Sequence, residues 1–198
     1  MLKGDAGKLE VYVMFAGGAE QAARLAKLVR LVASKDATKV EKLLTLADGN
    51  AGEFVRLSDL AFKFKQQPKP ANLPSPVSIT PYTGGANIAH FLDHTLEYMN
   101  LASRVNKPST SLWPPGTTPQ QLVSHYNDAI RQLAGPPVIH VSPGTPQQIT
   151  ISGGITVQIG TQSAASGLRV GQFFPYSYPN MVRLSQAETR AFADIVTR

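Results

Sequence analysis

Residues 118–135 read TPQQLVSHYNDAIRQLAG, and residues 148–174 read QITISGGITVQIGTQSAASGLRVGQFF. In the first stretch Thr118 can cap a helix, Pro119 suits its first position, and Gln121 completes a capping box. The apolar residues that follow recur at helical spacing to the end of the stretch. The second stretch consists of short β-branched runs separated by turn residues, a pattern typical of a small antiparallel sheet. A helix followed by a meander predicts an α+β fold rather than an alternating α/β fold.

Further elements are expected on both sides of these stretches. Two glycines precede a predicted helix over residues 86–103, and Ser185 with Glu188 forms a capping box for a terminal helix that ends at Thr197. The β-branched runs predict four strands, at Val138–Val141, Gln148–Ile151, Ile155–Ile159 and Leu168–Phe174.

The N-terminal third is helical and basic in character. Helical spacing predicts helices over residues 19–34 and 51–64, and a helix between them that is capped by Asp36 or Thr38 and runs through Leu46. Prolines at 68, 70, 74, 76 and 81 prevent a continuous helix or a central strand in the next segment. We therefore expect a helical segment over 1–67, a Pro-rich linker over 68–83 and an α+β domain over 84–198.

The composition limits the classes of function. A chain of 198 residues has room for one full domain and a smaller neighbour. Its 19 Lys and Arg against 13 Asp and Glu give a net charge of +6, which favours a polyanionic or an acidic protein partner. The absence of cysteine excludes disulfides, thiolate nucleophiles and cysteine-ligated zinc. No run approaches the ~20 apolar residues of a membrane span, so no stable membrane insertion is expected.

His90 and His94 are the leading candidates for catalysis. They stand four residues apart on the predicted helix 86–103, which would place both imidazoles on one face. One neutral histidine can take a proton from a ribose 2′-hydroxyl, while a protonated one can give a proton to the departing 5′-oxygen. This chemistry cleaves RNA and requires no metal and no other cofactor.

Two other interpretations of the histidine pair stay open. Many pairs at this spacing are surface or half-buried helix residues without a catalytic role. A histidine pair with Glu97 can also bind zinc, although Phe91 stands where the zinc-protease motif has glutamate.

Cleavage of a phosphodiester also needs a cation or fixed donors near the transition state. Arg169 is the first choice, because it interrupts an apolar strand, and Lys107 and Arg104 are second choices. The alternative for Arg169 is a solvated position on the strand. Tyr176 and Tyr178 can stack on unpaired bases, and Thr161 can donate to a phosphate.

Several other conspicuous residues are expected to be structural. Trp113 is predicted to anchor its Pro-rich loop on the core, and Phe173 and Phe174 are predicted to pack there. His125 and His140 each stand alone, which is more often typical of a structural histidine than of a catalyst.

An ordered set of motifs resembles a known family. The order Ala89-His90-Phe91-Leu92-Asp93-His94-Thr95, Leu112-Trp113-Pro114-Pro115-Gly116-Thr117-Thr118, a helix, a β meander and Phe173-Phe174-Pro175-Tyr176 resembles the toxin domains at the C-terminal ends of polymorphic and contact-dependent inhibition proteins of bacteria. It is similar to the barnase, EndoU, colicin and RelE-like group of metal-independent ribonucleases. The resemblance covers residues 84–198. No glutamate matches the base of barnase, and no residue clearly matches the EndoU lysine.

The resemblance implies a fold and a biological role. The fold would be helices ahead of an antiparallel sheet of four to five strands, with cleavage through a 2′,3′-cyclic phosphate by His90, His94 and Arg169. The protein would be secreted as part of a larger effector, act in the cytoplasm of a target cell on RNA such as tRNA, and exist as a monomer or as a heterodimer with an acidic immunity protein. Residues 1–67 would be a pre-toxin or delivery segment. The alternatives are a non-catalytic protein-binding module, a metal-dependent nuclease and an ADP-ribosyltransferase.

Overall fold

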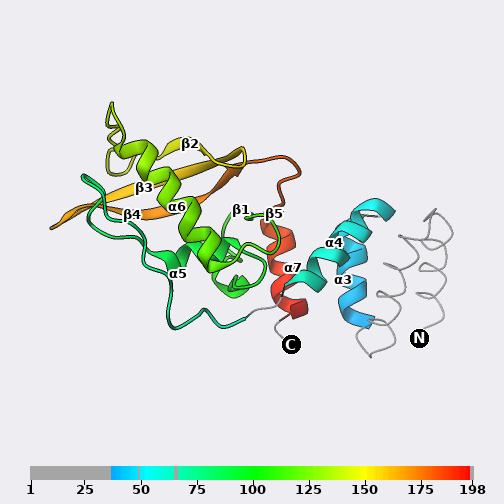
Figure 1. Cartoon of the computed structure of the whole chain (residues 1–198). Helices are drawn as coiled ribbons and strands as arrows, with labels where there is room; N and C mark the ends of the chain where they lie inside the picture. The colour runs from blue at the N-terminus through cyan, green and yellow to red at the C-terminus, as the bar shows by residue number, and fades with distance from the viewer. Residues whose placement is uncertain (1–36, 49, 65–66, 197–198) are drawn as a thin grey trace. The chain divides into compact units, whose positions relative to one another are not determined.

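The computed structural model describes residues 37–48, 50–64 and 67–196. They form an α+β protein, as predicted, with helices and antiparallel sheets (Figure 1). The chain divides into two compact units, Met1–Phe64 with Ala187–Arg198 and Lys65–Gln186. This division differs from the predicted boundaries, because the terminal helix belongs to the first unit and the Pro-rich segment belongs to the second.

The second unit is built on a three-stranded antiparallel sheet. Its strands are β2 (Gln147–Ile151), β3 (Ile155–Ala164) and β4 (Gly167–Ser177), in the order β2-β3-β4. Helix α6 (Pro119–Ala134) lies across this sheet (Figure 1). The predicted capping box is present, since the Thr118 hydroxyl accepts from the Gln121 amide at 3.2 Å and the Gln121 side chain accepts from the Thr118 amide at 2.8 Å.

The core of this unit lies between α6 and one face of the sheet. Alternation along the strands places Val157 and Ile159 of β3 and Phe173 of β4 in that core. Phe173 also packs against Trp113, at a ring distance of 5.3 Å, and against Tyr126, at 5.6 Å. This core covers one face of the sheet. The alternate side chains point to the other face and are available to form a site.

Two further strands form a separate sheet. β1 (Ser109–Ser111) pairs in antiparallel fashion with β5 (Arg183–Ser185). The expected single sheet of four to five strands is thus wrong, because the described residues form one sheet of three strands and one of two.

The predicted strand Val138–Val141 is not formed. The segment follows the pair Pro136-Pro137, and prolines cannot donate to a strand ladder. Its polar groups are satisfied instead by tertiary contacts: the Tyr82 hydroxyl donates to the carbonyl of Ile139 and accepts from the amide of Val141. Val141 is buried there, while Val138 and Ile139 are exposed.

The predicted helix over residues 86–103 is also wrong in its length. The segment contains a short α5 (Ile88–Phe91), a 3-10 turn η1 (Leu92–His94) and a second 3-10 turn η2 (Leu101–Ser103). Thr95 has extended backbone angles, and both its amide and its hydroxyl donate to the carbonyl of Leu92. The carbonyl of His94 accepts from the Trp113 amide at 2.7 Å, so a tertiary hydrogen bond replaces one that would continue the helix.

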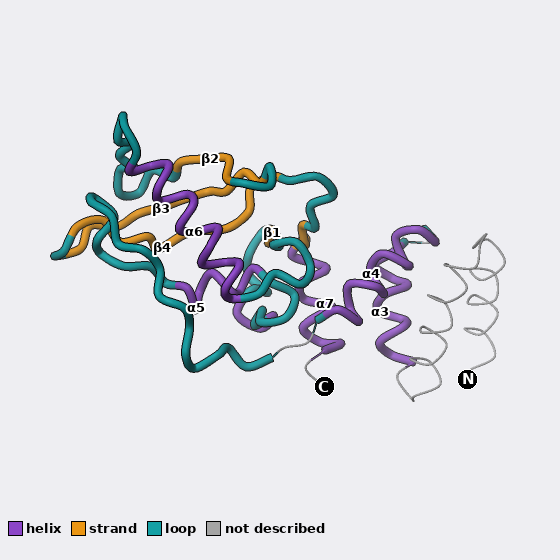
Figure 2. The backbone as a smooth tube through the Cα atoms, in the orientation of Figure 1, coloured by secondary structure: helices purple, strands orange, loops and turns teal. Residues whose placement is uncertain are grey.

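The Pro-rich segment packs on the second unit and is not a free linker. It runs as loop before α5 (Figure 2). Leu73, Val77 and Ile79 contact the core, and the amide of Val77 donates to the side chain of Asn127 at 2.8 Å. Prolines here exclude regular structure without preventing burial.

The described residues of the first unit are helical, as predicted for residues 51–64 and for the C-terminal helix. It contains α3 (Ala37–Ala47), α4 (Ala51–Lys63) with Asn50 as its N-cap, and the predicted C-terminal helix α7 (Gln186–Val196). The predicted helix over residues 19–34 lies outside the described residues. None of the helices in the described ranges combines the length and the apolar character that crossing a membrane requires.

Candidate functional site

A pocket of about 340 Å³ opens on the face of the β2-β3-β4 sheet that lies opposite the core. Two imidazoles, three cationic side chains, two aromatic rings and four small or amide side chains line it: His90, His94, Arg104, Lys107, Arg183, Phe174, Tyr176, Ser109, Ser111, Gln158 and Gln172. The volume falls within the range of about 300–1,000 Å³ that is usual for small-ligand sites.

Strand alternation explains how the sheet contributes to the pocket. On β4, Phe173 points to the core, so its neighbours Gln172 and Phe174 point to the opposite face. On β3, Gln158 stands between two core residues and shares that opposite face. The same pattern that buries one side of the sheet therefore supplies the floor of the pocket.

His94 is buried, and its ring is fixed in one orientation. Its Nδ1 lies 2.8 Å from the carbonyl oxygen of Ser111, and its ring stacks on Phe174 with centroids 5.0 Å apart and planes 11° apart. A carbonyl only accepts hydrogen bonds, so Nδ1 carries the proton and Nε2 of the neutral ring keeps a free lone pair. Burial, together with the positive charge of Arg104, lowers the pKa of His94 from its ordinary 6.5 to about 4.

His90 lies beside His94 but in a different environment. Its ring is partly exposed, and its Nδ1 lies 3.2 Å from Oδ2 of Asp93. The two imidazole centroids are 6.5 Å apart and the ring planes meet at 82°. A carboxylate at Nδ1 orients the ring, leaves Nε2 for another partner and offers a counter-charge to the protonated form.

Asp93 is the centre of a buried charge cluster. Besides His90, its carboxylate faces Lys69, at 2.6 Å from Nζ, and Arg104, at 3.6 Å from Nη2. Burial lowers the pKa of Arg104, and the carboxylate of Asp93 acts in the opposite direction. The cluster thus holds two permanent cations against one anion and keeps Arg104 directed toward the pocket.

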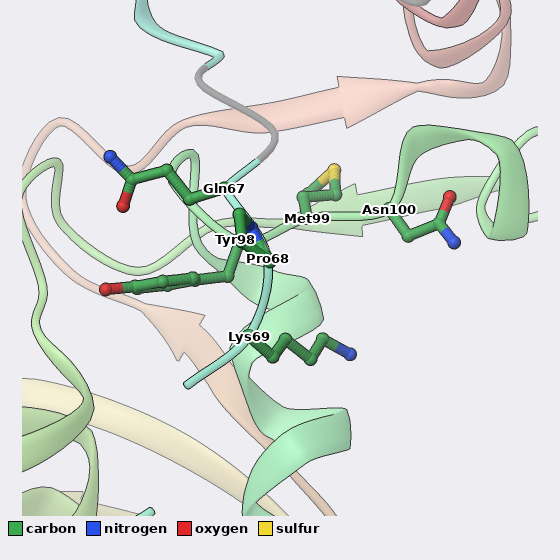
Figure 3. A pocket seen from close by; sticks show the side chains of 6 residues that line it. All are labelled: Gln67, Pro68, Lys69, Tyr98, Met99 and Asn100. Atoms are coloured by element: carbon green, nitrogen blue, oxygen red, sulfur yellow. The ribbon is translucent and has the colours of Figure 1, made fainter. Parts of the chain in front are cut away.

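A second, larger pocket adjoins this cluster. It has a volume of about 480 Å³ and is lined by Gln67, Pro68, Lys69, Tyr98, Met99 and Asn100. Figure 3 shows the side chain of Lys69 extending away from the ring of Tyr98. Lys69 links the two pockets, because its ammonium group pairs with the Asp93 carboxylate that orients His90.

The structure brings four of the seven predicted site residues together. His90, His94, Lys107 and Tyr176 all line the pocket of about 340 Å³. Arg104, the other second-choice cation, also lines it.

Three predicted site residues lie elsewhere. Arg169 is exposed on β4 opposite Gln162, nearer the β3–β4 turn, and does not line the pocket. Thr161 is buried, and its hydroxyl donates to the carbonyl of Val141 at 2.6 Å. Tyr178 donates from its hydroxyl to the carbonyl of Leu112 at 2.7 Å. The roles expected of these three residues in the site are therefore corrected to solvated or structural ones.

Glu97 does not complete a metal site with the histidines. One of its carboxylate oxygens accepts from the amide of Gly116 at 3.1 Å, and Glu97 does not line the pocket. Across the described ranges, no three His, Asp or Glu side chains are grouped as a metal ion would require.

Trp113 anchors its loop, as expected. Its side chain is fully buried and stacks on His125, with centroids 5.4 Å apart. Burial lowers the pKa of His125, while the charge of Asp128 opposes that effect. His125 is therefore a packing residue of α6, while Trp113 fixes the backbone of His94.

Sequence reasoning missed Asp93 and six of the residues that line the pocket: Ser109, Ser111, Gln158, Gln172, Phe174 and Arg183. Asp93 could have been found from its position three residues after His90, a spacing that allows contact on a helix. The glutamines could have been found by extending the strand alternation to the face opposite the core. Arg183 gave no local signal, because β5 is formed only by pairing with β1.

The site combines a neutral buried imidazole, a carboxylate-oriented imidazole and a set of cations. No family model, curated protein or solved structure matches this chain. Its function must therefore be argued from the chemistry that these side chains can perform.

Proposed function

We propose that the pocket cleaves RNA by metal-independent transesterification. The observation that carries the proposal is that His90 and His94 line one pocket with Arg104, Lys107 and Arg183. Cleavage at a ribose needs a base for the 2′-hydroxyl, an acid for the 5′-oxygen and positive charge at the phosphate. All three kinds of group face the same space.

His94 is assigned as the base and His90 as the acid. Nε2 of neutral His94 takes the proton of the 2′-hydroxyl, and the oxygen attacks phosphorus. The bond from phosphorus to the 5′-oxygen breaks, and protonated His90 gives its proton to that oxygen. The products are a 2′,3′-cyclic phosphate and a free 5′-hydroxyl. The environments of the two rings support this division, since one is kept neutral and the other faces a carboxylate.

The cations support the same chemistry. Arg104, Lys107 and Arg183 can stabilise the negative charge that gathers on the phosphate oxygens in the transition state. A bound phosphate also opposes the effect of Arg104 on His94, because an anion favours the protonated ring. Substrate binding thus raises the proton affinity of the base at the time when it is needed.

The same surface fits the role of a toxin delivered to another cell. Basic and aromatic side chains at the pocket, among them Lys107, Arg183 and the exposed Tyr176, are suited to an acidic protein that blocks access of RNA. We propose further that the protein is a secreted effector that acts on RNA such as tRNA in the cytoplasm of a target cell. An acidic immunity protein would neutralise it.

The test is RNA cleavage by the purified full chain in EDTA. His90→Ala and His94→Ala are each expected to lower kcat/KM by about 100-fold or more, the usual contribution of a positioned acid or base. His140→Ala is the matched control, since His140 is exposed and does not line the pocket. The products should carry 2′,3′-cyclic phosphate, and a 2′-deoxy substitution at the cleavage site should stop the reaction. Full activity of the double histidine variant would reject the proposal.

A further inference from the structure

Two side-chain amides in the pocket have no role in the proposed chemistry. Gln158 and Gln172 line it, and within the described part of the chain neither side chain makes a hydrogen bond. We propose that they read the edge of one nucleobase next to the scissile phosphate, with Tyr176 as a stacking surface. This inference rests on the proposed function and specifies how that site selects its substrate.

The strand register places the two amides close together. Gln158 of β3 pairs with Phe174 of β4, and Gln172 pairs with Gly160. Gln158 and Gln172 are therefore diagonal neighbours on one sheet face, a relation that places side chains about 7–8 Å apart. Amides at that separation can approach two positions on the edge of a single base.

Gly160 gives Gln172 the space that it occupies. A Cβ atom added to Gly160 would lie 2.8 Å from Oε1 and 3.2 Å from Cβ of Gln172. The side chain of Gln172 thus lies over the backbone of Gly160, where any larger residue would displace the amide. The closest atom belongs to the end of a flexible side chain and can move away, while the approach to Cβ of Gln172 requires a shift of a few tenths of an ångström.

The aromatic residues of β4 complete a slot for a planar group. Phe174 already stacks on His94, so part of its ring is occupied. Tyr176 follows two residues later on the same strand and is 40% exposed, which leaves its ring free to stack. Bases stack on such rings with little sequence preference, and selectivity must come from hydrogen bonds at the edge.

An amide suits a base edge because of its chemistry. It presents a donor and an acceptor side by side, and base edges present the complementary pair. The phosphate has separate partners in Arg104, Lys107 and Arg183, so the amides are not needed for it. The pocket thus divides into a charged part for the backbone of RNA and an amide part for one base.

The experiment measures binding of nucleotides to the full chain by NMR titration. The probes are the 3′-monophosphates of adenosine, guanosine, cytidine and uridine, with ribose 5-phosphate as the probe without a base. At least one nucleotide is expected to bind about tenfold more tightly than ribose 5-phosphate, the size of one good base-edge contact. Gln158→Ala and Gln172→Ala should remove most of that difference and narrow the spread among the four nucleotides.

Two further variants make the test specific. Gly160→Ala should reproduce the effect of Gln172→Ala without changing either glutamine. Gln162→Ala is the matched control, because Gln162 lies exposed on β3 outside the pocket. Circular dichroism checks that each variant is folded. If Gly160→Ala does not fold, Gln158→Ala and Gln172→Ala still decide the question.

The outcomes separate this inference from the proposed function. If all five probes bind equally, or if the glutamine variants leave the differences unchanged, the base site is rejected whether or not RNA is cleaved. If nucleotides bind as expected but RNA is not cleaved, the ribonuclease proposal fails and the base site stands. If RNA is cleaved, kcat/KM on the sixteen dinucleotides should show a base preference that Gln158→Ala and Gln172→Ala reduce.

Discussion

His94 shows how one residue acquires its chemistry from its surroundings. The carbonyl of Ser111 fixes its tautomer, Phe174 covers its ring, and burial keeps it neutral. Its neighbour His90 is partly exposed and faces a carboxylate. Two residues of the same type therefore have different environments, which is the condition for dividing acid and base work.

The pKa of His94 predicts how activity responds to acid. Because that pKa is lowered from 6.5 to about 4, the ring remains neutral, and can accept a proton, at pH values well below 6.5. We expect the acidic limb of kcat/KM for RNA cleavage to fall near pH 4, and the His94 ring resonance in NMR to titrate in the same range. An acidic limb and a resonance shift that both centre near 6.5 would contradict the environment described for this ring.

The same shift predicts a loss of stability in acid. Between pH 6.5 and about 4 the unfolded chain binds a proton at His94 that the folded chain does not, so the free energy of unfolding decreases as pH falls. The difference between a pKa of 6.5 in the unfolded chain and about 4 in the folded chain corresponds to roughly 3 kcal/mol of stability, lost between these two pH values. Urea unfolding at pH 7 and pH 4.5 should show a smaller loss for His94→Gln than for the natural chain. Equal losses would show that His94 does not carry the effect.

Asp93 is expected to act as a positioning residue. Asp93→Asn removes the charge that orients His90 and balances Lys69 and Arg104. Activity should fall about 10- to 100-fold, as it does when an orienting partner is lost, and unfolding should become easier by about 1–3 kcal/mol. Both are measured on the same preparation, by kinetics and by urea. Asp128→Asn is the control, since that carboxylate contacts Ser152 outside the pocket and should leave kcat/KM unchanged.

At the scale of elements, local signals predicted α6 well and α5 poorly. The capping box, the proline at the first position and the apolar periodicity of α6 all act within the helix itself. The helical segment made of α5 and η1 ends before Thr95, because the amide of Trp113 and the hydroxyl of Thr95 donate to its last carbonyls. A signal that lies in the element can be recognised from sequence, whereas a competing tertiary hydrogen bond cannot.

The cap of α6 offers a direct test at this scale. Thr118→Ala removes the side-chain acceptor for the Gln121 amide and should lower the free energy of unfolding by about 1 kcal/mol. Thr118→Ser keeps the hydroxyl and should recover most of the loss. Urea unfolding measures both, and equal stability of the alanine and serine variants would show that the cap contributes little.

Strand β4 shows what alternation can and cannot predict. It separates Phe173, in the core, from Gln172 and Phe174, on the pocket face, so the expectation that Phe174 also packs in the core is wrong. It does not say how far along the strand a pocket extends. A cation that interrupts an apolar strand, such as Arg169, can therefore lie outside the pocket. The position of the pocket along β4 depends on where α5, β1 and β5 meet the sheet.

At the scale of the molecule, the net charge of +6 favours RNA binding only where exposed cationic side chains lie together. Lys107 and Arg183 are exposed cations at the pocket, while Arg104 is paired with Asp93. A chain binding single-stranded RNA through two such cations should show a slope of about −1.4 for log kcat/KM against log salt concentration, at about −0.7 for each phosphate contact.

Variants of these cations test where RNA lies. Lys107→Gln and Arg183→Gln should each make the slope less steep by about 0.7. Arg169→Gln should leave it unchanged, since Arg169 lies outside the pocket. A slope that responds to Arg169 and not to Arg183 would place the RNA on the β3–β4 turn instead.

The sequence by itself determined the α+β class, helix α6, three strands of the sheet and two histidines that share a pocket with Lys107 and Tyr176. These features depend on periodicity, on caps and on the chemistry of single side chains, all of which are local. Tertiary structure alone decided the β1–β5 pair, the end of α5, the burial of the Pro-rich segment and the place of Arg183, rather than Arg169, in the pocket. The reason is physical, because hydrogen bonds and charges between distant segments form only when the whole core has brought those segments together.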